Sequence, residues 1–274
     1  MSSLPNLSSI EFWAQPADER ERGFRRLRDE APLSWQDQPE TRLLPAEDGS
    51  GGYWAATRFE DIQEVSRDTE RFVSGRGVML EDVPQEFLDA AQSFLAMDGD
   101  RHRNLRKLVS SGFTPRQVHH LEDGIRSDVG QILDSLAGHE QGDFVELVAK
   151  QLPLMTIMRM LGVPEHDRER LVHQADAMVS WNDPDYIGER EPLEVIGTAI
   201  ATLHQACIEY CEQRREQPGD DLISALVQAE VDGERLSNEQ IASFFVLLSV
   251  AGNDTTRHTT SHTMRQLTLH PDQR

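Results

Sequence analysis

The segment from Ala251 to Thr256 places residues that can do chemistry inside an otherwise apolar stretch. Gly, Asn, Asp and Thr are all weaker helix formers than average, so their presence together in one helix needs a reason. The small side chains of Ala251 and Gly252 allow another group to approach the backbone closely. The Thr255 hydroxyl can bond to the carbonyl of Ala251 and open the helix locally, and Asp254 adds a titratable group. The pattern predicts a flat ligand against an opened helix, with an acid and a hydroxyl beside it.

A basic island from Arg101 to Lys107 is the second candidate site in this acidic sequence. His102 and Arg106 are four residues apart and share one helical face, whereas Arg103 and Lys107 share the neighbouring face. The first face can hold paired carboxylates through charge-assisted hydrogen bonds. The second face can dock an acidic partner.

The chemistry of the 251–256 segment depends on one long helix. Ser237 and Gln240 have the spacing of a capping box, and nothing breaks the helical pattern before the His270-Pro271 pair. The run is about 33 residues long, which corresponds to roughly 50 Å at 1.5 Å per residue. We therefore expect a helix that crosses the whole domain.

The rest of the chain is also predominantly helical in its pattern. Thr57 and Glu60 have the spacing of a capping box for a helix that runs to about Asp68. Residues 51–56 predict a short strand, and residues 78–96 predict a long loop with a helical piece. Further helices are expected over residues 19–30, 101–111, 115–136, 165–179, 193–216 and 220–229. The predicted fold class is mainly α with a small β-sheet.

Composition limits the classes of function. The 274 residues are 38% hydrophobic and 27% charged, which is an ordinary globular balance. The formal charge of −21 excludes nucleic acid and anionic membrane as partners of the bulk surface. The N-terminus has no basic or apolar leader pattern, and the longest apolar run, 241–252, is too short to span a bilayer. We expect a cytoplasmic protein without a membrane span.

Each signal also has a less specific explanation. Taken alone, the 251–256 segment fits a buried helix with a tolerated polar patch, and the basic island fits a solvated helix face. His258 and His262 have the spacing of a zinc helix, but Thr259 stands where a zinc protease needs its Glu base. The sequence therefore predicts no metal ligand among these residues.

A rival enzyme class is the all-helical, magnesium-dependent terpene synthases. Asp220-Asp221 and Asn253-Asp254 are the pairs that suggest it. Ser224 stands where the first motif needs a third Asp, and Arg257 stands where the second needs a Ser. Both motifs lack a metal ligand, which argues against this class.

Four blocks of the sequence resemble those of bacterial cytochromes P-450, in the same order. AGNDTTR looks like the oxygen-activating I-helix motif, and MDGDRHRNLRKLVSSGFTP looks like the C-helix block. DDLISALVQAEVDGERLSNEQIASFFVLLSVAGNDTTR is similar to the run from the H-helix to the I-helix. GYWAATRFEDIQEVSRDTERFVS resembles the first sheet and B-helix. The resemblance covers about residues 20 to 274 and implies the cytochrome P-450 fold.

The resemblance implies a haem-thiolate monooxygenase that inserts one oxygen atom into an unactivated C–H bond. The cofactor would be haem b, and a ferredoxin-type redox partner would deliver electrons from NAD(P)H. His102 and Arg106 would bind the haem propionates, while Arg103 and Lys107 form part of the face that docks the electron donor.

The resemblance also assigns roles within the AGNDTTR motif. Ala251 and Gly252 would form the oxygen-binding groove. Asp254 would help feed protons from solvent, and Thr255 would position water and donate hydrogen bonds during oxygen activation. Cleavage of the oxygen–oxygen bond consumes protons in a pocket kept dry for the substrate, so the chemistry needs such a relay.

The substrate implied by the resemblance is a lipophilic small molecule. AGNDTTRHTTSHTMRQLTLHPDQR and the 182–185 loop look similar to bacterial members that oxidise sterol side chains and other long hydrophobic molecules. The expected pocket residues are Val78, Met79, Leu80, Phe94, Val179 and Leu248.

The chain departs from the family pattern in one respect. The family carries a Glu-x-x-Arg helix and a cysteine-bearing loop further on, and neither is present. The axial ligand of this family is a Cys thiolate, whereas Cys207 and Cys211 fall in the G-helix region. We therefore expect a single domain over residues 1–274 that is C-terminally truncated and, alone, inactive. The alternative is a catalytically dead, haem-free helical fragment that binds a lipid or a partner, and haem titration distinguishes the two.

Overall fold

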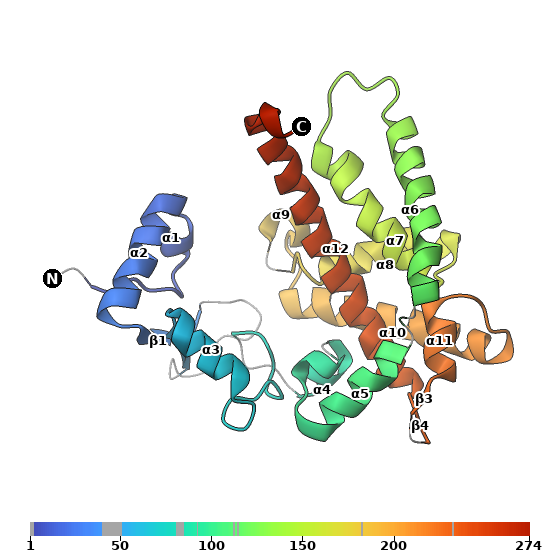
Figure 1. The fold of residues 1–274 in the computed structure, drawn as a ribbon, viewed down its shortest axis with the longest axis horizontal. Coiled ribbons are helices and arrows are strands. Elements are labelled where there is room, and N and C mark those ends of the chain that lie inside the picture. The colour runs from blue at the N-terminus through green and yellow to red at the C-terminus, as the bar shows by residue number, and fades with distance from the viewer. Residues whose placement is uncertain are drawn as a thin grey trace. The chain divides into compact units, whose positions relative to one another are not determined.

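The structure is a computed structural model that describes residues 3–39, 51–80, 85–91, 93–111, 113, 115–181, 183–231 and 233–274. It confirms the predicted fold class, because helices dominate and the strands form two small antiparallel hairpins (Figure 1). The chain divides into two compact units, one of Met1–Leu88 with Leu95–Asp98 and one of Asp89–Phe94 with Gly99–Arg274. Within the described residues, no helix is both long and apolar enough to cross a membrane.

The first unit contains a hairpin and short helices. Its elements are α1 (Ile10–Trp13), α2 (Ala17–Glu30), β1 (Leu33–Asp37), β2 (Gly52–Ala56) and α3 (Phe59–Arg67). The strand expected at 51–56 is confirmed as β2, and it pairs with β1 so that Trp35 lies opposite Trp54. Gln36 is buried and accepts a hydrogen bond from the backbone N–H of Leu7 at 2.8 Å. This bond ties the N-terminal segment to the hairpin.

The capping box predicted at Thr57 and Glu60 is wrong. Helix α3 begins at Phe59, and its N-cap residue, Arg58, makes no side-chain capping bond. The Thr57 hydroxyl instead donates to the carbonyl of Pro32 at 3.1 Å. The Thr57 hydroxyl therefore bonds to a carbonyl distant in sequence, just before β1, and does not cap α3.

Two elements run from one unit into the other, α4 (Gln85–Ala91) and the 3-10 turn η1 (Ser93–Ala96). The second unit contains the remaining elements. They are α5 (Gly99–Ser111), α6 (Pro115–Ser135), the π-helical turn η2 (Val145–Ala149), α7 (Gln151–Leu161), α8 (Glu165–Ala177), α9 (Pro184–Ile187), α10 (Pro192–Glu216), α11 (Leu222–Gln228), β3 (Glu230–Val231), β4 (Glu234–Arg235), α12 (Asn238–Leu269) and the 3-10 turn η3 (Pro271–Gln273).

Helix α12 is the central element of the second unit (Figure 1). Its 32 residues correspond to about 48 Å. The predicted capping box is confirmed, since Ser237 and Gln240 bond to each other's backbone. Helix α10 packs along α12, α8 packs on α10, and α7 lies between α12 and α6. The first half of α12 is therefore in the core, whereas residues from His258 onward are mostly exposed.

A glycine, Gly162, ends α7 at the point where α7, α10 and the start of α11 meet. Gly162 caps the helix in the left-handed conformation, with φ of 77°. Arg214 donates to the Gly162 carbonyl at 3.0 Å and to Asp221 at 2.7 Å. A Cβ on Gly162 would approach the Asp221 carboxyl carbon to 2.4 Å. The glycine lets α7, α10 and the start of α11 meet at one point.

Candidate active site

The 251–256 segment remains helical throughout, despite its weak helix formers. The Thr255 hydroxyl donates to the carbonyl of Ala251 at 2.8 Å, which confirms the predicted bond. Ala251 and Thr255 are both exposed and lie one turn apart. They form an open face of small and hydroxyl-bearing side chains on α12.

Gly252 lies on a different face of α12, against α7. A Cβ at this position would come within 2.2 Å of Cδ1 of Ile157. The glycine is therefore required by helix packing. Sequence reasoning predicted close approach at this position but could not name Ile157.

Asp254 is half-buried and is held from within its own helix. Its Oδ1 accepts a hydrogen bond from Arg257 and lies 3.3 Å from Nε2 of His258. The guanidinium of Arg257 also lies 3.5 Å from Oδ1 of Asp176 on α8. Arg257 thus bridges the predicted acid of the site and a second carboxylate.

Asp176 is the centre of a buried polar cluster that sequence reasoning missed. It accepts a hydrogen bond from the Asn253 amide at 3.1 Å, and Nζ of Lys150 lies 3.2 Å from its Oδ2. Asn253 is 1% exposed, and its amide oxygen has no partner among the described residues. Asp176 and Asn253 are 77 positions apart, so only the fold brings them together. The one sign of this cluster in the sequence was an acidic residue between two alanines, Ala175 and Ala177, both of which are buried in the structure.

The π-helical turn η2 places Lys150 in this cluster. The backbone N–H of Lys150 bonds to the Val145 carbonyl, and the wide turn packs against α12. Burial disfavours the charged ammonium, but the carboxylates of Asp176 and Glu146 outweigh it and raise the pKa of Lys150. The lysine is therefore a permanent cation beside Asp176 at neutral pH.

The two predicted basic pairs on helix α5 differ in burial only at His102. Leu105 and Val109 face the core, and His102 at the edge of this face is half-buried. Arg106 is exposed and forms no ion pair with any residue that the structure describes. Arg103 is exposed on the far side, where it pairs with Asp100. Lys107, also exposed, is one turn further on the same side.

The predicted pocket residues fall in both units. Val78, Met79 and Leu80 belong to the first unit, and Val78 and Leu80 are 51% and 55% exposed. In the second unit, Phe94 stacks on Phe244 with ring centroids 5.9 Å apart. The Phe94 ring also lies 6.0 Å from that of His102. The structure thus links a predicted pocket residue to α12 and α5.

Val179 and Leu248, the other pocket residues predicted in the second unit, are both half-buried. Val179 follows the end of α8, and Leu248 lies one turn before Gly252 on α12.

Both cysteines are fully buried in the middle of α10. Their thiols hydrogen-bond to each other, and burial raises the pKa of Cys207. Neither sulfur is available to a ligand at the exposed face of α12. Within the described residues, no group of three or more His, Cys, Asp or Glu side chains is arranged to hold a metal ion.

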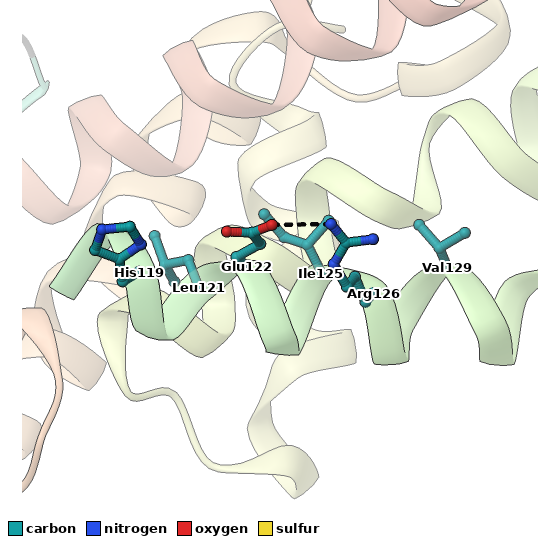
Figure 2. Close-up of a pocket in the computed structure, with 6 residues that line it drawn as sticks. All are labelled: His119, Leu121, Glu122, Ile125, Arg126 and Val129. Atoms are coloured by element: carbon teal, nitrogen blue, oxygen red, sulfur yellow. Dashed lines mark hydrogen bonds and ion pairs between the residues drawn. The ribbon is translucent and has the colours of Figure 1, made fainter. Parts of the chain in front are cut away.

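A surface hollow of about 740 Å³ lies along α6, away from every predicted site residue (Figure 2). Its lining combines apolar side chains with the Glu122–Arg126 ion pair, whose atoms are 2.9 Å apart. The six described residues that line it all belong to α6. A second hollow of about 530 Å³ lies beside His258 and His262 at the exposed end of α12.

Comparison with known proteins gives a consistent result. The family model for cytochrome P450 matches residues 52–274. The chain is 36% identical over 271 residues to a methyl-branched lipid omega-hydroxylase of Mycobacterium tuberculosis, covering 98% of this chain and 62% of that protein. It is 35% identical to a steroid C26-monooxygenase of the same species, covering 98% of this chain and 63% of that protein.

A solved structure extends the likeness to three dimensions. A Mycobacterium marinum cytochrome P450, CYP268A2, in complex with pseudoionone, superposes with a TM-score of 0.86 and 51% identity, covering all of this chain and 67% of that one. The chain belongs to the cytochrome P450 family, whose members are monooxygenases. It spans less than two thirds of the length of the curated relatives named above.

Haem, the prosthetic group that the family implies, fits part of this chain. The exposed face of Ala251 and Thr255 is open to a flat ligand, and Arg106 is free of carboxylate partners among the described residues. The iron ligand does not fit, because both cysteines are free thiols buried in α10. Among the described residues, the exposed face of α12 and the exposed Arg106 thus leave room for haem, whereas neither cysteine can bind its iron.

Proposed function

We propose that this chain supplies the distal part of the active site of a haem monooxygenase for a lipophilic substrate. The substrate class is a methyl-branched lipid or a steroid side chain, because relatives covering 98% of the chain are named for those activities. The reaction would insert one atom of O₂ into a C–H bond and release the other as water. Two electrons from NAD(P)H and two protons complete the balance.

The observation that carries this proposal is the Asp254–Thr255 pair beside the open face of α12. The Thr255 hydrogen is directed to the Ala251 carbonyl, so the hydroxyl oxygen can accept a hydrogen bond from water on its exposed side. Asp254, the preceding residue, is half-buried and within reach of solvent. A hydroxyl that orders water and an acid that exchanges protons with it form a short relay.

Arg257 controls the acid in this scheme. In the structure its guanidinium holds Asp254 and also reaches Asp176. The Asp254 carboxylate must turn away from Arg257 to pass a proton to water near Thr255. Asp176, with Lys150 and Asn253, fixes the far side of Arg257.

Haem b, when bound, would supply the oxygen chemistry. His102 and Arg106 would hold its propionates from the edge of α5. Phe94, Val179 and Leu248 would line the part of the substrate pocket that belongs to the second unit. Arg103 and Lys107 would dock a ferredoxin-type donor in the cytoplasm.

The test is a chimera in which Arg274 is followed by the segment of the M. marinum relative that bears the cysteine loop. In this protein Thr255→Ala should uncouple the reaction, so that NAD(P)H is consumed and hydrogen peroxide replaces product. Thr259→Ala is the matched control, because Thr259 is one turn further on, exposed, and bonds to the Thr255 carbonyl at 2.8 Å. Equal coupling in the two variants would remove Thr255 from the relay.

A second function is favoured by the burial of both cysteines. The chain alone would then be a haem-free helical protein that binds a lipid or a partner. Titration of the 274-residue chain with haem separates the alternatives. Saturable quenching of tryptophan fluorescence that weakens in Arg106→Ala supports the haem site, whereas no saturable binding supports the second function.

A further inference from the structure

Side chains able to bind or support a metal ion recur at every fourth position along the second half of α12. The series consists of Asp254, His258, His262, Gln266 and His270. Side chains four residues apart share a helical face, with Cβ atoms about 5–6 Å apart. Successive members of the series are therefore neighbours on the surface of the helix.

His258 and His262 are the two imidazoles that are neighbours in this series. Their rings are stacked, with centroids 6.3 Å apart and an angle of 28° between the ring planes. Both residues are exposed, and both line the hollow of about 530 Å³ at this end of α12. Because neither ring fills the core, both can rotate to meet a ligand from solvent.

The carboxylate of Asp254 orients the first of the two imidazoles. Its Oδ1 lies 3.3 Å from Nε2 of His258. A proton on Nε2 satisfies this contact, so the neutral ring keeps the lone pair of Nδ1 for a metal ion. Arg257 also pairs with the carboxylate and limits its movement. A carboxylate behind a metal-binding imidazole fixes the tautomer and raises the basicity of the ligand.

The separation of the two rings suits a shared ion after a small rotation. Zinc–nitrogen bonds are about 2.0–2.1 Å long, so two imidazoles on one tetrahedral ion have centroids roughly 5 Å apart. The rings of His258 and His262 must approach each other by about 1 Å, which exposed side chains achieve by small changes in χ angles. His270 is eight residues beyond His262, about 12 Å along the helix axis, and cannot share the same ion.

We propose that His258 and His262 chelate one divalent cation of the class that imidazole prefers, Zn²⁺, Ni²⁺ or Cu²⁺. Two histidines four apart on one helical face are also the zinc ligands of metalloprotease helices. Thr259 replaces the base of such a protease, but that base is not a metal ligand. The missing base, from which we predicted no metal ligand here, therefore leaves binding intact. Among the described residues no third ligand of the His, Cys, Asp or Glu type completes the site, so water fills the remaining positions.

A cation at this site also acts on Asp254. Coordination makes the N–H of His258 a stronger hydrogen-bond donor, which holds the Asp254 carboxylate more tightly. Zn²⁺ would then restrain the acid of the proton relay, a consequence that rests on the proposed function. The metal site itself does not rest on it.

Isothermal titration calorimetry of the 274-residue chain with Zn²⁺ tests the site without haem. The parent should bind one Zn²⁺ in a saturable step that Mg²⁺ does not produce, because Mg²⁺ prefers oxygen ligands. His258→Ala or His262→Ala should remove this step, and Asp254→Asn should weaken it roughly tenfold. His270→Ala is the matched control, because His270 lines the same hollow but lies out of reach, and it should keep the parent affinity.

The inference is overturned if the parent shows no saturable Zn²⁺ step, or if Mg²⁺ reproduces that step. It is also overturned if His270→Ala weakens binding as much as His262→Ala does, since the ion would then bind histidines without regard to spacing. If His262→Ala lost helical circular dichroism, His262→Gln would replace it, because Gln is a good helix former, and would have to remove the step. All of these outcomes are independent of monooxygenase activity.

Discussion

Replacement of Asp176 by Asn should destabilise the chain, because it removes the anion that three groups share. The Asn253 amide, the Lys150 ammonium and the Arg257 guanidinium all lie within 3.5 Å of its carboxylate. Asp176 is only 7% exposed, so water cannot easily take the place of its charge. The variant keeps the shape of the side chain and removes only its charge.

The magnitude follows from the surroundings of the two cations. Removal of one partner from a fully buried pair costs about 3–5 kcal/mol. Lys150 keeps Glu146 at 3.5 Å, and Arg257 keeps Asp254, so both cations retain a second carboxylate. We therefore expect a loss of about 2 kcal/mol in the free energy of unfolding.

Urea denaturation of the 274-residue chain at neutral pH measures this loss. Asp100→Asn is the matched control, because Asp100 pairs with Arg103 on the surface and should change stability by less than about 0.5 kcal/mol. In a double-mutant cycle, Lys150→Met should be clearly less harmful when Asp176 is already Asn. If Asp176→Asn matched Asp100→Asn, or the cycle showed no coupling, the cluster would not hold α8 to α12.

Three further predictions follow from the same elements. Gly252→Ala should lower the free energy of unfolding, measured by urea denaturation, by about 1–3 kcal/mol, because its Cβ would overlap Cδ1 of Ile157. Adding Ile157→Val to Gly252→Ala should recover part of this loss. If the effects of the two substitutions were strictly additive, this packing contact would be contradicted. The pKa of Lys150 is raised above its ordinary 10.5, so the stability it contributes is complete below pH 10.5 and is lost as pH rises through the folded value. The stability gap between parent and Lys150→Met should therefore stay constant up to that pH and shrink above it, and a gap that widened would contradict the sign. In the chimera, Arg103→Glu or Lys107→Glu should slow the reduction of the haem iron, mainly at low ionic strength, and leave haem content unchanged. His102→Ala or Arg106→Ala should instead lower haem content at any ionic strength. Equal haem loss in all four variants would show that the two faces are misassigned.

Local patterns predicted the parts of the site that depend on neighbouring residues. The capping box at Ser237 and Gln240 and the bond from Thr255 to Ala251 are both confirmed. Each joins residues three or four positions apart, where helix geometry alone fixes the contact. The same reasoning failed at Thr57, because the carbonyl of Pro32 lies outside any local window.

Long-range contacts account for what the sequence did not reveal. Asp176 meets Asn253 because the fold packs α8 directly against α12 as well as against α10. The reach of Lys150 depends on a π-helical turn, which has no clear sequence signal. Gly252 was predicted to admit a close neighbour, but its identity as Ile157 required the fold.

The most direct test of the central claim is the absorption spectrum of the 274-residue chain after titration with haem, reduction and exposure to carbon monoxide. The account predicts that haem binds, that binding weakens in Arg106→Ala, and that no thiolate Soret band appears, because Cys207 and Cys211 are buried in α10. A thiolate Soret band from this chain would contradict the account, since a described cysteine would then reach the iron.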